Sequence, residues 1–187
     1  MAADGDHSDE QLALDWARGD QAAFRCLYAR HKGRLYAFLL RCLGRRDAAD
    51  DCFQETWARA IGAIGRWRPQ ARFSTWLLQI AHNLAVDRMR RQRPLVSIDD
   101  DEGPLPGSLL LDGGPHADPA AALEALQEGR RLRRAIAALP PEQRTAVLLR
   151  LDAELPLEEI AQITGAGRET VKSRLRYAMD KLREALA

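Results

Sequence analysis

The sequence has little cysteine, no long apolar segment and no alternating apolar pattern of the kind that predicts β-strands. None of the three cysteines lies in a Cys-x-x-Cys pair, and their number is odd, which argues against a zinc or disulfide site. The longest apolar runs, such as residues 109–111, are far too short to span a bilayer. The acidic N-terminus lacks the features of a secretion signal. These absences predict a cytoplasmic protein with no membrane insertion, metal or cofactor.

Helical periodicity is present almost everywhere outside residues 94–117, so the sequence predicts an all-α fold. In residues 1–93, the pattern predicts a short helix over 9–17, a second ending at Gly44, a third opening near Asp47, and a long one from Phe73 to about Gln92. The third helix is expected to bury Phe53, Trp57, Ala60, Ile61 and Ile64. The long helix is expected to bury Phe73, Leu77, Ile80, Ala81 and Leu84.

Residues 94–117 have no periodic pattern and are rich in proline, glycine and aspartate. They contain five acidic residues and no lysine or arginine. A segment of this composition and length predicts a flexible acidic linker. We therefore expect two small helical domains, residues 1–93 and 118–187, on either side of it.

The second domain has the pattern of a helix-turn-helix. A short helix over 156–164 is followed by the turn Gly165-Ala166-Gly167 and by a last helix from Arg168. The last helix is expected to bury Val171, Leu175, Ala178, Leu182 and Leu186. This arrangement fits a helix in the DNA major groove, although a solvated amphipathic helix has the same spacing. The candidate duplex-contacting residues are Arg168, Glu169, Thr170, Lys172, Ser173, Arg174, Arg176 and Tyr177.

The long helix of the first domain has a polar strip opposite its expected core, made of Thr75, Gln79, His82, Asn83, Val86 and Arg90. Between Arg66 and Arg93 there are seven arginines and one acid, a charge pattern that attracts phosphates. Aromatic side chains beside such a patch suit an unpaired base, and Trp67 is the strongest candidate. The candidate single-strand contacts are Trp67, Arg72, Ser74, Thr75, Trp76, Gln79, Asn83, Arg90, Arg91 and Arg93.

Four motifs, in order, resemble extracytoplasmic-function (ECF) sigma factors of the sigma-70 family. They are Gly19-Asp20-Gln21-Ala22-Ala23-Phe24, Ala49-Asp50-Asp51-Cys52-Phe53-Gln54-Glu55-Thr56-Trp57, Phe73-Ser74-Thr75-Trp76-Leu77-Leu78-Gln79-Ile80-Ala81-His82-Asn83, and Leu139-Pro140-Pro141-Glu142-Gln143-Arg144. The run Thr170-Val171-Lys172-Ser173-Arg174-Leu175 resembles their recognition helix. The sequence departs from the pattern at Gly167, where serine is common, and at Tyr177 and Met179, where arginine is frequent.

The resemblance implies a sigma region 2 domain that binds core RNA polymerase and reads and opens the −10 element, and a region 4 domain that reads the −35 element. It implies no catalytic activity, and an anti-sigma factor as a further partner. It also implies that the linker passes near the polymerase active centre. The residues implied to bind the clamp helices of the polymerase are Asp47, Asp50, Asp51, Gln54 and Glu55.

Two other functions remain to be weighed. A stand-alone helix-turn-helix regulator would bind its site tightly without polymerase, but no ligand domain or dimer interface is evident. An enzyme of nucleic-acid metabolism would need a catalytic constellation, and the four histidines are scattered, with no paired carboxylate or phosphate loop.

Overall fold

The computed structural model describes residues 7–91, 119–151 and 154–187, and the regular elements of these residues are all helices. This confirms the predicted fold class. The predicted linker, residues 94–117, lies outside the described residues, as does Arg93.

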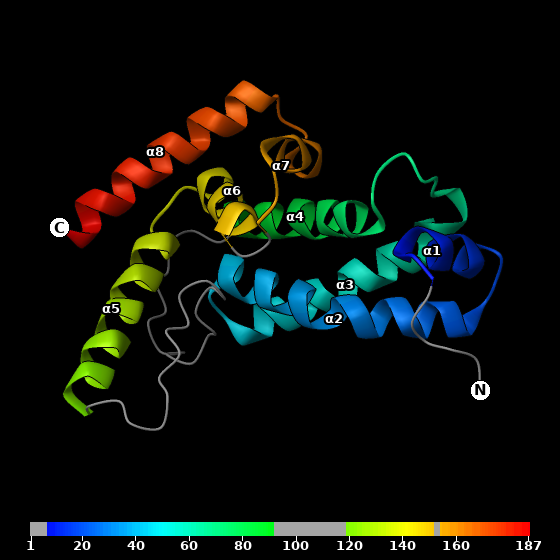
Figure 1. Ribbon diagram of the computed structural model, residues 1–187, viewed down its shortest axis with the longest axis horizontal. Coiled ribbons are helices and arrows are strands. Elements are labelled where there is room, and N and C mark those ends of the chain that lie inside the picture. Colours follow the sequence, from blue (N-terminus) through cyan, green and yellow to red (C-terminus); the bar gives the residue numbers. More distant parts are fainter. Residues whose placement is uncertain (1–6, 92–118, 152–153) are drawn as a thin grey trace.

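The first domain consists of α1 (Asp9–Ala17), α2 (Gln21–Leu43), α3 (Arg46–Ala63), the short 3-10 helix η1 (Ile64–Arg66) and α4 (Phe73–Arg91). Asp20 caps the start of α2 by accepting hydrogen bonds from the backbone N–H groups of Ala22 and Ala23. Gly44, with φ of +71°, ends the same helix in the left-handed conformation that glycine adopts without strain. Helices α2, α3 and α4 pack together, and α1 packs across one end (Figure 1).

The second domain consists of α5 (Pro119–Ala137), α6 (Pro141–Leu151), α7 (Leu157–Thr164) and α8 (Arg168–Leu186). Gly165, with φ of +61°, makes the turn between α7 and α8. The predicted short helix, glycine turn and last helix are therefore confirmed. Helix α8 runs along the outside of the molecule, while α6 and α7 lie between it and the first domain (Figure 1).

Aromatic side chains make up only 6% of the sequence, yet most of them gather in one cluster of the first domain. Phe73 is fully buried at its centre, with ring centroids 6.4 Å from Trp16, 6.3 Å from Trp67 and 5.7 Å from Trp76. Close aromatic pairs add to the free energy gained by burying these large side chains. The cluster therefore fixes the first turn of α4 against α1 and the loop that follows η1.

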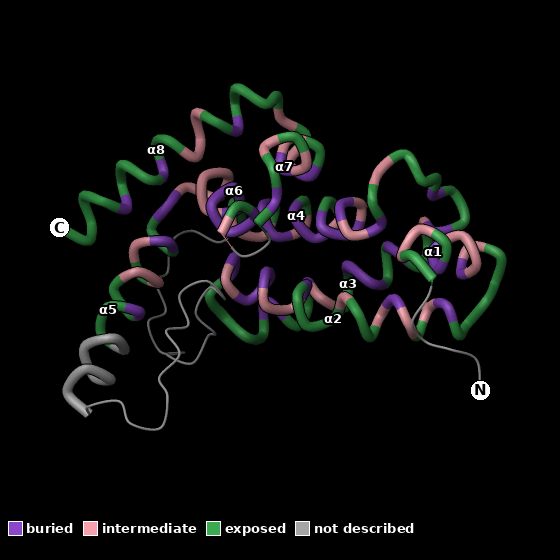
Figure 2. The backbone as a smooth tube through the Cα atoms, viewed as in Figure 1, coloured by how far each residue is buried: buried purple, intermediate pink, exposed green. Residues whose placement is uncertain are grey.

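The two domains share one continuous apolar core. Helix α4 packs against α6 and α7, and α2 packs against α6. Figure 2 shows buried segments of α4 facing α6 and α7. The sequence predicted two domains joined by a linker, but its periodicity contained no signal for this packing.

Side chains in three elements of the chain lie differently from the sequence-based expectation. Ile61 was expected in the core but is 54% exposed, because it lies two helical turns after Gln54 and shares its outward face. Leu186, also expected inward, is 43% exposed in the last turn of α8. Trp67, expected to be available to an unpaired base, is 5% exposed because its ring packs against Phe73 and Trp76.

Gly167 and Gly165 offer a matched test of the turn before α8. Gly167 is the N-cap residue of α8, and its φ of −67° is one that any residue can adopt. A serine there could accept a hydrogen bond from the first turn of α8, so Gly167→Ser should stabilise the chain by about 0.5 kcal/mol. At Gly165 the positive φ strains any other side chain, so Gly165→Ser should destabilise it by about 1 kcal/mol. Urea denaturation of the two variants measures both changes, and a shift of the same sign in both would contradict this account of the turn.

Candidate nucleic-acid interface

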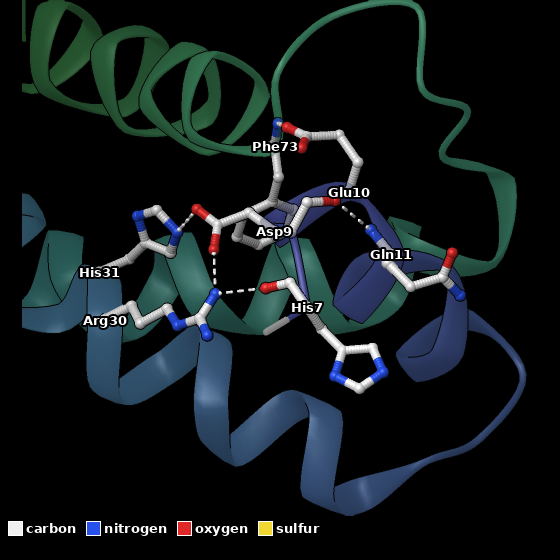
Figure 3. Close-up of polar contacts among 8 residues, drawn as sticks. His7, Asp9, Glu10, Gln11, Arg30, His31 and Phe73 are labelled. Carbon is white, nitrogen blue, oxygen red and sulfur yellow. Dashed lines mark hydrogen bonds and ion pairs between the residues drawn. The ribbon is translucent and has the colours of Figure 1, made fainter. Parts of the chain in front are cut away.

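The start of α4 is held by a polar cluster on α1 and α2 (Figure 3). Glu10 accepts a hydrogen bond from the backbone N–H of Phe73 at 3.2 Å, which satisfies a donor left unpaired at a helix start. Its neighbour Asp9 contacts Arg30 at 2.9 Å and His31 Nε2 at 2.7 Å. These contacts fix α1 on α2 and position Glu10. The motifs did not single out Glu10, since its partner is 63 residues away.

The second domain covers part of the polar strip on α4: Thr75, His82 and Val86 are buried, whereas Gln79, Asn83 and Arg90 remain exposed. Thr75 is 3% exposed, and its hydroxyl donates to Glu159 of α7 at 3.2 Å. Arg72 contacts the other carboxylate oxygen of Glu159 at 3.3 Å, and the Gln79 amide donates to the backbone carbonyl of Gln162 at 3.2 Å. The sequence correctly placed Thr75 and Gln79 on one face of α4. It did not predict that α7 packs against this face.

The other end of the strip contacts α6. Arg90 donates through Nε to Glu142 at 3.1 Å, and its Nη2 lies 2.5 Å from the same carboxylate oxygen. Arg144, two residues after Glu142 on α6, donates to the carbonyl of Cys42 at 2.7 Å and to the carbonyls of Ala137 and Leu139. Its largely buried guanidinium thus joins the ends of α2 and α5, and burial lowers the pKa of Arg144.

His82 lies in the middle of this interface and is 5% exposed. Burial, with Arg174 and Arg90 nearby, lowers the pKa of His82 to about 4, although Glu142 acts in the opposite direction. Its Nδ1 atom is buried without a hydrogen-bond partner among the described residues. The side chain is therefore held neutral where the two domains meet.

The remaining candidates on and around α4 divide by exposure. Asn83 and Arg91 are exposed, Ser74 and Trp76 are partly buried, and Trp67 is inside the aromatic cluster. Trp67 therefore braces the start of α4 in this conformation, and Trp76 is the aromatic residue that reaches the surface beside the arginines.

The outward face of α8 is open along its N-terminal half. Arg168, Lys172 and Arg176 are exposed, and the Arg176 guanidinium lies over the Tyr177 ring at 4.9 Å. Arg168 contacts Glu158 at 2.6 Å, an exposed pair that a phosphate can displace at little cost. Exposed side chains also include Glu169, Thr170 and Tyr177, while Ser173 and Arg174 are partly buried.

The candidate polymerase-binding residues share one exposed face of α3: Asp47, Asp50, Asp51, Gln54 and Glu55. Asp51 contacts Arg88 of α4 at 2.6 Å, and Glu55 contacts Arg59 at 2.8 Å. A hydrogen bond from the Ala48 backbone and one from Arg45 lower the pKa of Asp47. Ile61 extends this acidic face with an exposed apolar side chain, which its spacing from Gln54 could have indicated.

Over the described residues, no helix has the length and apolar content needed to cross a bilayer. The same part of the chain brings together no group of three or more histidine, cysteine, aspartate or glutamate side chains suited to a metal ion.

Comparisons with known proteins give a consistent result. The profile of sigma-70 region 2 matches residues 27–94, and that of sigma-70 region 4 matches residues 135–184. The ECF RNA polymerase sigma factor SigW of Bacillus subtilis is 32% identical over 174 residues, which cover 90% of this chain and 91% of SigW.

Two solved structures are similar in fold. CnrH in complex with the cytosolic domain of CnrY has a TM-score of 0.69 and 26% identity, covering 96% of this chain and 97% of the other. The sigma factor RpoE of Bartonella quintana, in complex with the anti-sigma factor NepR, has a TM-score of 0.62 and 22% identity, covering 87% and 96%. The second likeness concerns the fold alone.

His82 provides a pH test of the interface between α4 and the second domain. The folded chain holds His82 neutral, whereas the unfolded chain protonates it below the ordinary pKa of 6.5. The contribution of His82 to stability is therefore fully present above pH 6.5 and is lost as the pH falls toward 4. The loss amounts to about 3 kcal/mol at most.

The nuclear magnetic resonance titration of His82 should therefore give a pKa of about 4 in the intact chain. The His82→Gln variant should lose part of the pH dependence of unfolding between these values. A His82 resonance that titrates at the ordinary histidine value would show that the side chain is not buried in solution.

Proposed function

This chain belongs to the ECF RNA polymerase sigma factors of the sigma-70 family, and from that premise we propose how its surfaces divide the work of promoter recognition. In this proposal residues 1–93 bind core RNA polymerase and the −10 element, residues 118–187 bind the −35 element, and residues 94–117 connect them. The observation that carries the proposal is the exposed basic face of α8 behind a glycine turn, in the same chain as the arginine-bearing α4.

The proposed −35 contacts are on the N-terminal half of α8. A helix of this width enters the major groove, where arginine and lysine bind phosphates and guanine edges. Tyr177 and Met179 are both exposed where other members of the family frequently have arginine, so we expect fewer cationic contacts there. The proposed contact residues are Arg168, Glu169, Thr170, Lys172, Ser173, Arg174, Arg176 and Tyr177.

The proposed −10 contacts are on α4 and the loop before it. Arginines bind the backbone, and Trp76 and the polar side chains of the strip contact bases of the separated strand. Such binding opens a duplex without covalent chemistry, because it favours the single-stranded state. The set is Arg72, Ser74, Thr75, Trp76, Gln79, Asn83, Arg90 and Arg91, with Arg93 from the sequence alone. Trp67 supports this surface from beneath.

The proposed polymerase contact is the exposed face of α3. An amphipathic helix with an exposed polar face suits docking onto partner helices. The acidic residues offer negative charge to the partner surface, and Ile61 adds an exposed apolar side chain at one end of the face. Interfaces of this kind draw much of their affinity from a few buried apolar groups.

We further propose that the chain acts in the cytoplasm, takes no catalytic part in transcription and is itself bound by an anti-sigma factor. The binding of the cytosolic domain of CnrY by CnrH, a protein of similar fold, supports the last point.

The polymerase assignment is tested by reversing the charge of α3. Asp50→Lys with Asp51→Lys should abolish co-elution with core polymerase on a sizing column while the helical content is kept. Ile61→Ser alone should weaken binding about tenfold, since the apolar surface that Ile61 would bury against the polymerase is then missing. The control is Asp180→Lys with Glu184→Lys, the same charge change in the C-terminal half of α8. Normal assembly by the α3 variants would refute this contact surface.

The −35 assignment is tested on α8. Arg174→Ala with Arg176→Ala should weaken promoter binding by the holoenzyme and lower the slope of log affinity against log salt by about 1 per lost phosphate contact. Arg183→Ala, an exposed cation in the last turn, serves as the control and should change neither. An equal salt slope in the wild type, the Arg174/Arg176 variant and the Arg183 control would argue against −35 contacts by α8. Tight sequence-specific binding without core polymerase would instead favour a stand-alone regulator.

A further inference from the structure

We propose that α1 takes part in strand opening, because its Glu10 positions the loop and the first turn of α4, which carry the proposed −10 contacts. The inference rests on the proposed function of α4. Helix α1 lies before residues 27–94, the segment that matches sigma-70 region 2. Glu10 is in this inference a positioning residue, which acts on the −10 surface through the backbone of α4 and makes no contact with DNA itself.

The first turn of α4 has no carboxylate of its own. It contains no acidic residue, although the unpaired backbone N–H groups at the start of a helix favour negative charge. Glu10 provides a carboxylate from another helix, and its Oε1 atom accepts a hydrogen bond from the backbone N–H of Phe73 at 3.2 Å. The start of α4 is therefore completed by a side chain that lies 63 residues earlier in the chain.

The position of Glu10 is fixed by its neighbour Asp9 (Figure 3). One carboxylate oxygen of Asp9 contacts Arg30 of α2 at 2.9 Å, and the other contacts His31 Nε2 at 2.7 Å. The His31 ring in turn packs against the Phe73 ring, with the ring centroids 5.3 Å apart. Two consecutive carboxylates of α1 therefore act on Phe73, Glu10 directly and Asp9 through His31.

Phe73 lies among the proposed −10 contacts. Arg72 comes directly before it, and Ser74 and Thr75 directly after it. Glu10 also lines one cavity of about 420 Å³ together with residues 69–72, Thr75 and two residues of α7. A displacement of the Phe73 backbone thus moves side chains that are proposed to contact the separated strand. Since contacts that are held in place beforehand cost less to form, loss of the Glu10 hydrogen bond weakens capture of that strand.

The place of α1 in the fold separates this effect from the other proposed surfaces. Helix α1 packs on α2, η1 and α4, whereas the proposed polymerase contact is on α3 and the proposed −35 contacts are on α8. We therefore expect that a change at Glu10 leaves assembly with core polymerase and binding to duplex DNA intact. Opening of the −10 element is the step that should change.

The experiment compares holoenzymes that contain the wild-type chain, Glu10→Ala, Glu10→Gln or Asp15→Ala. Glu10→Ala removes the hydrogen-bond acceptor, whereas Glu10→Gln keeps an oxygen that accepts from the Phe73 N–H. Asp15→Ala is the matched control, because it removes a carboxylate of the same helix that bonds Gln11 and Arg18 and lies away from α4. Asp9→Ala is a second test variant, because it leaves Glu10 in place and removes its anchor on α2.

Two DNA templates separate opening from the other steps of initiation. The first is a duplex promoter fragment selected by run-off transcription, on which permanganate reactivity of thymines measures the rate of opening. The second is the same fragment with a mismatched bubble over the reactive thymines, so that no melting is required. Run-off rates are measured on both templates. Co-elution with core polymerase and circular dichroism check assembly and folding.

We expect Glu10→Ala to open the duplex about fivefold to tenfold more slowly than the wild type, as the loss of one hydrogen bond to a charged group allows. Its run-off rate on the bubble template should be close to that of the wild type, because melting is no longer required. Asp9→Ala should show the same dependence on the template. Glu10→Gln and Asp15→Ala should open the duplex at a rate close to that of the wild type.

Wild-type opening by Glu10→Ala would overturn the inference, as would an equal loss of rate on the two templates or an equal loss in Asp15→Ala. If Glu10→Ala does not fold, Asp9→Ala decides by the same criteria. Any of these results with a wild-type chain that directs initiation would reject the role of α1 alone. A wild-type chain that directs no initiation would reject the proposed function and the inference with it.

Discussion

The burial of Phe73 at the first turn of α4 is the constraint on which the other surfaces depend. The ring is packed by Trp16, Trp67 and Trp76, and its backbone N–H is held by Glu10. These contacts set the direction in which α4 leaves the cluster, and so the position of its arginines. The same helix then packs on α3, where Arg88 meets the acidic face through Asp51. The proposed polymerase and DNA surfaces are therefore positioned by one helix.

Because α4 is buried on more than one side, part of its polar strip is covered by α6 and α7. Most amphipathic helices expose the face opposite their core. On α4 that face contains Leu78, Thr75, His82 and Val86, which are buried in the described arrangement. Neutral His82 and the carboxylates of Glu142 and Glu159 suit this packing, and the exposed arginines at the two ends of the strip suit the proposed binding of phosphates.

Much of the fold followed from local patterns. Glycine at 44 and 165 predicted helix ends, and the structure has both residues with positive φ. The face of α8 also followed from helical spacing, whereas the acidic residues of α3 were singled out by the family resemblance. Ile61 was assigned inward because it continues the apolar stripe of Phe53 and Trp57 at helical spacing, while the position of the neighbouring helices leaves it outside. Trp67 was assigned outward because it lies in a loop, and only the aromatic cluster shows that this loop folds back over α4.

The sequence by itself determined the helices, the turn before α8 and the residue types on each face, because these depend on contacts between residues a few positions apart. Only the tertiary structure decided that Glu159 lies on Thr75 and Glu142 on Arg90, 84 and 52 residues away respectively. Periodicity fixes the direction of a side chain relative to its own helix, and it contains no information on which distant helix lies opposite. The physical reason is that packing between domains depends on the complementarity of two whole faces, which no local pattern records.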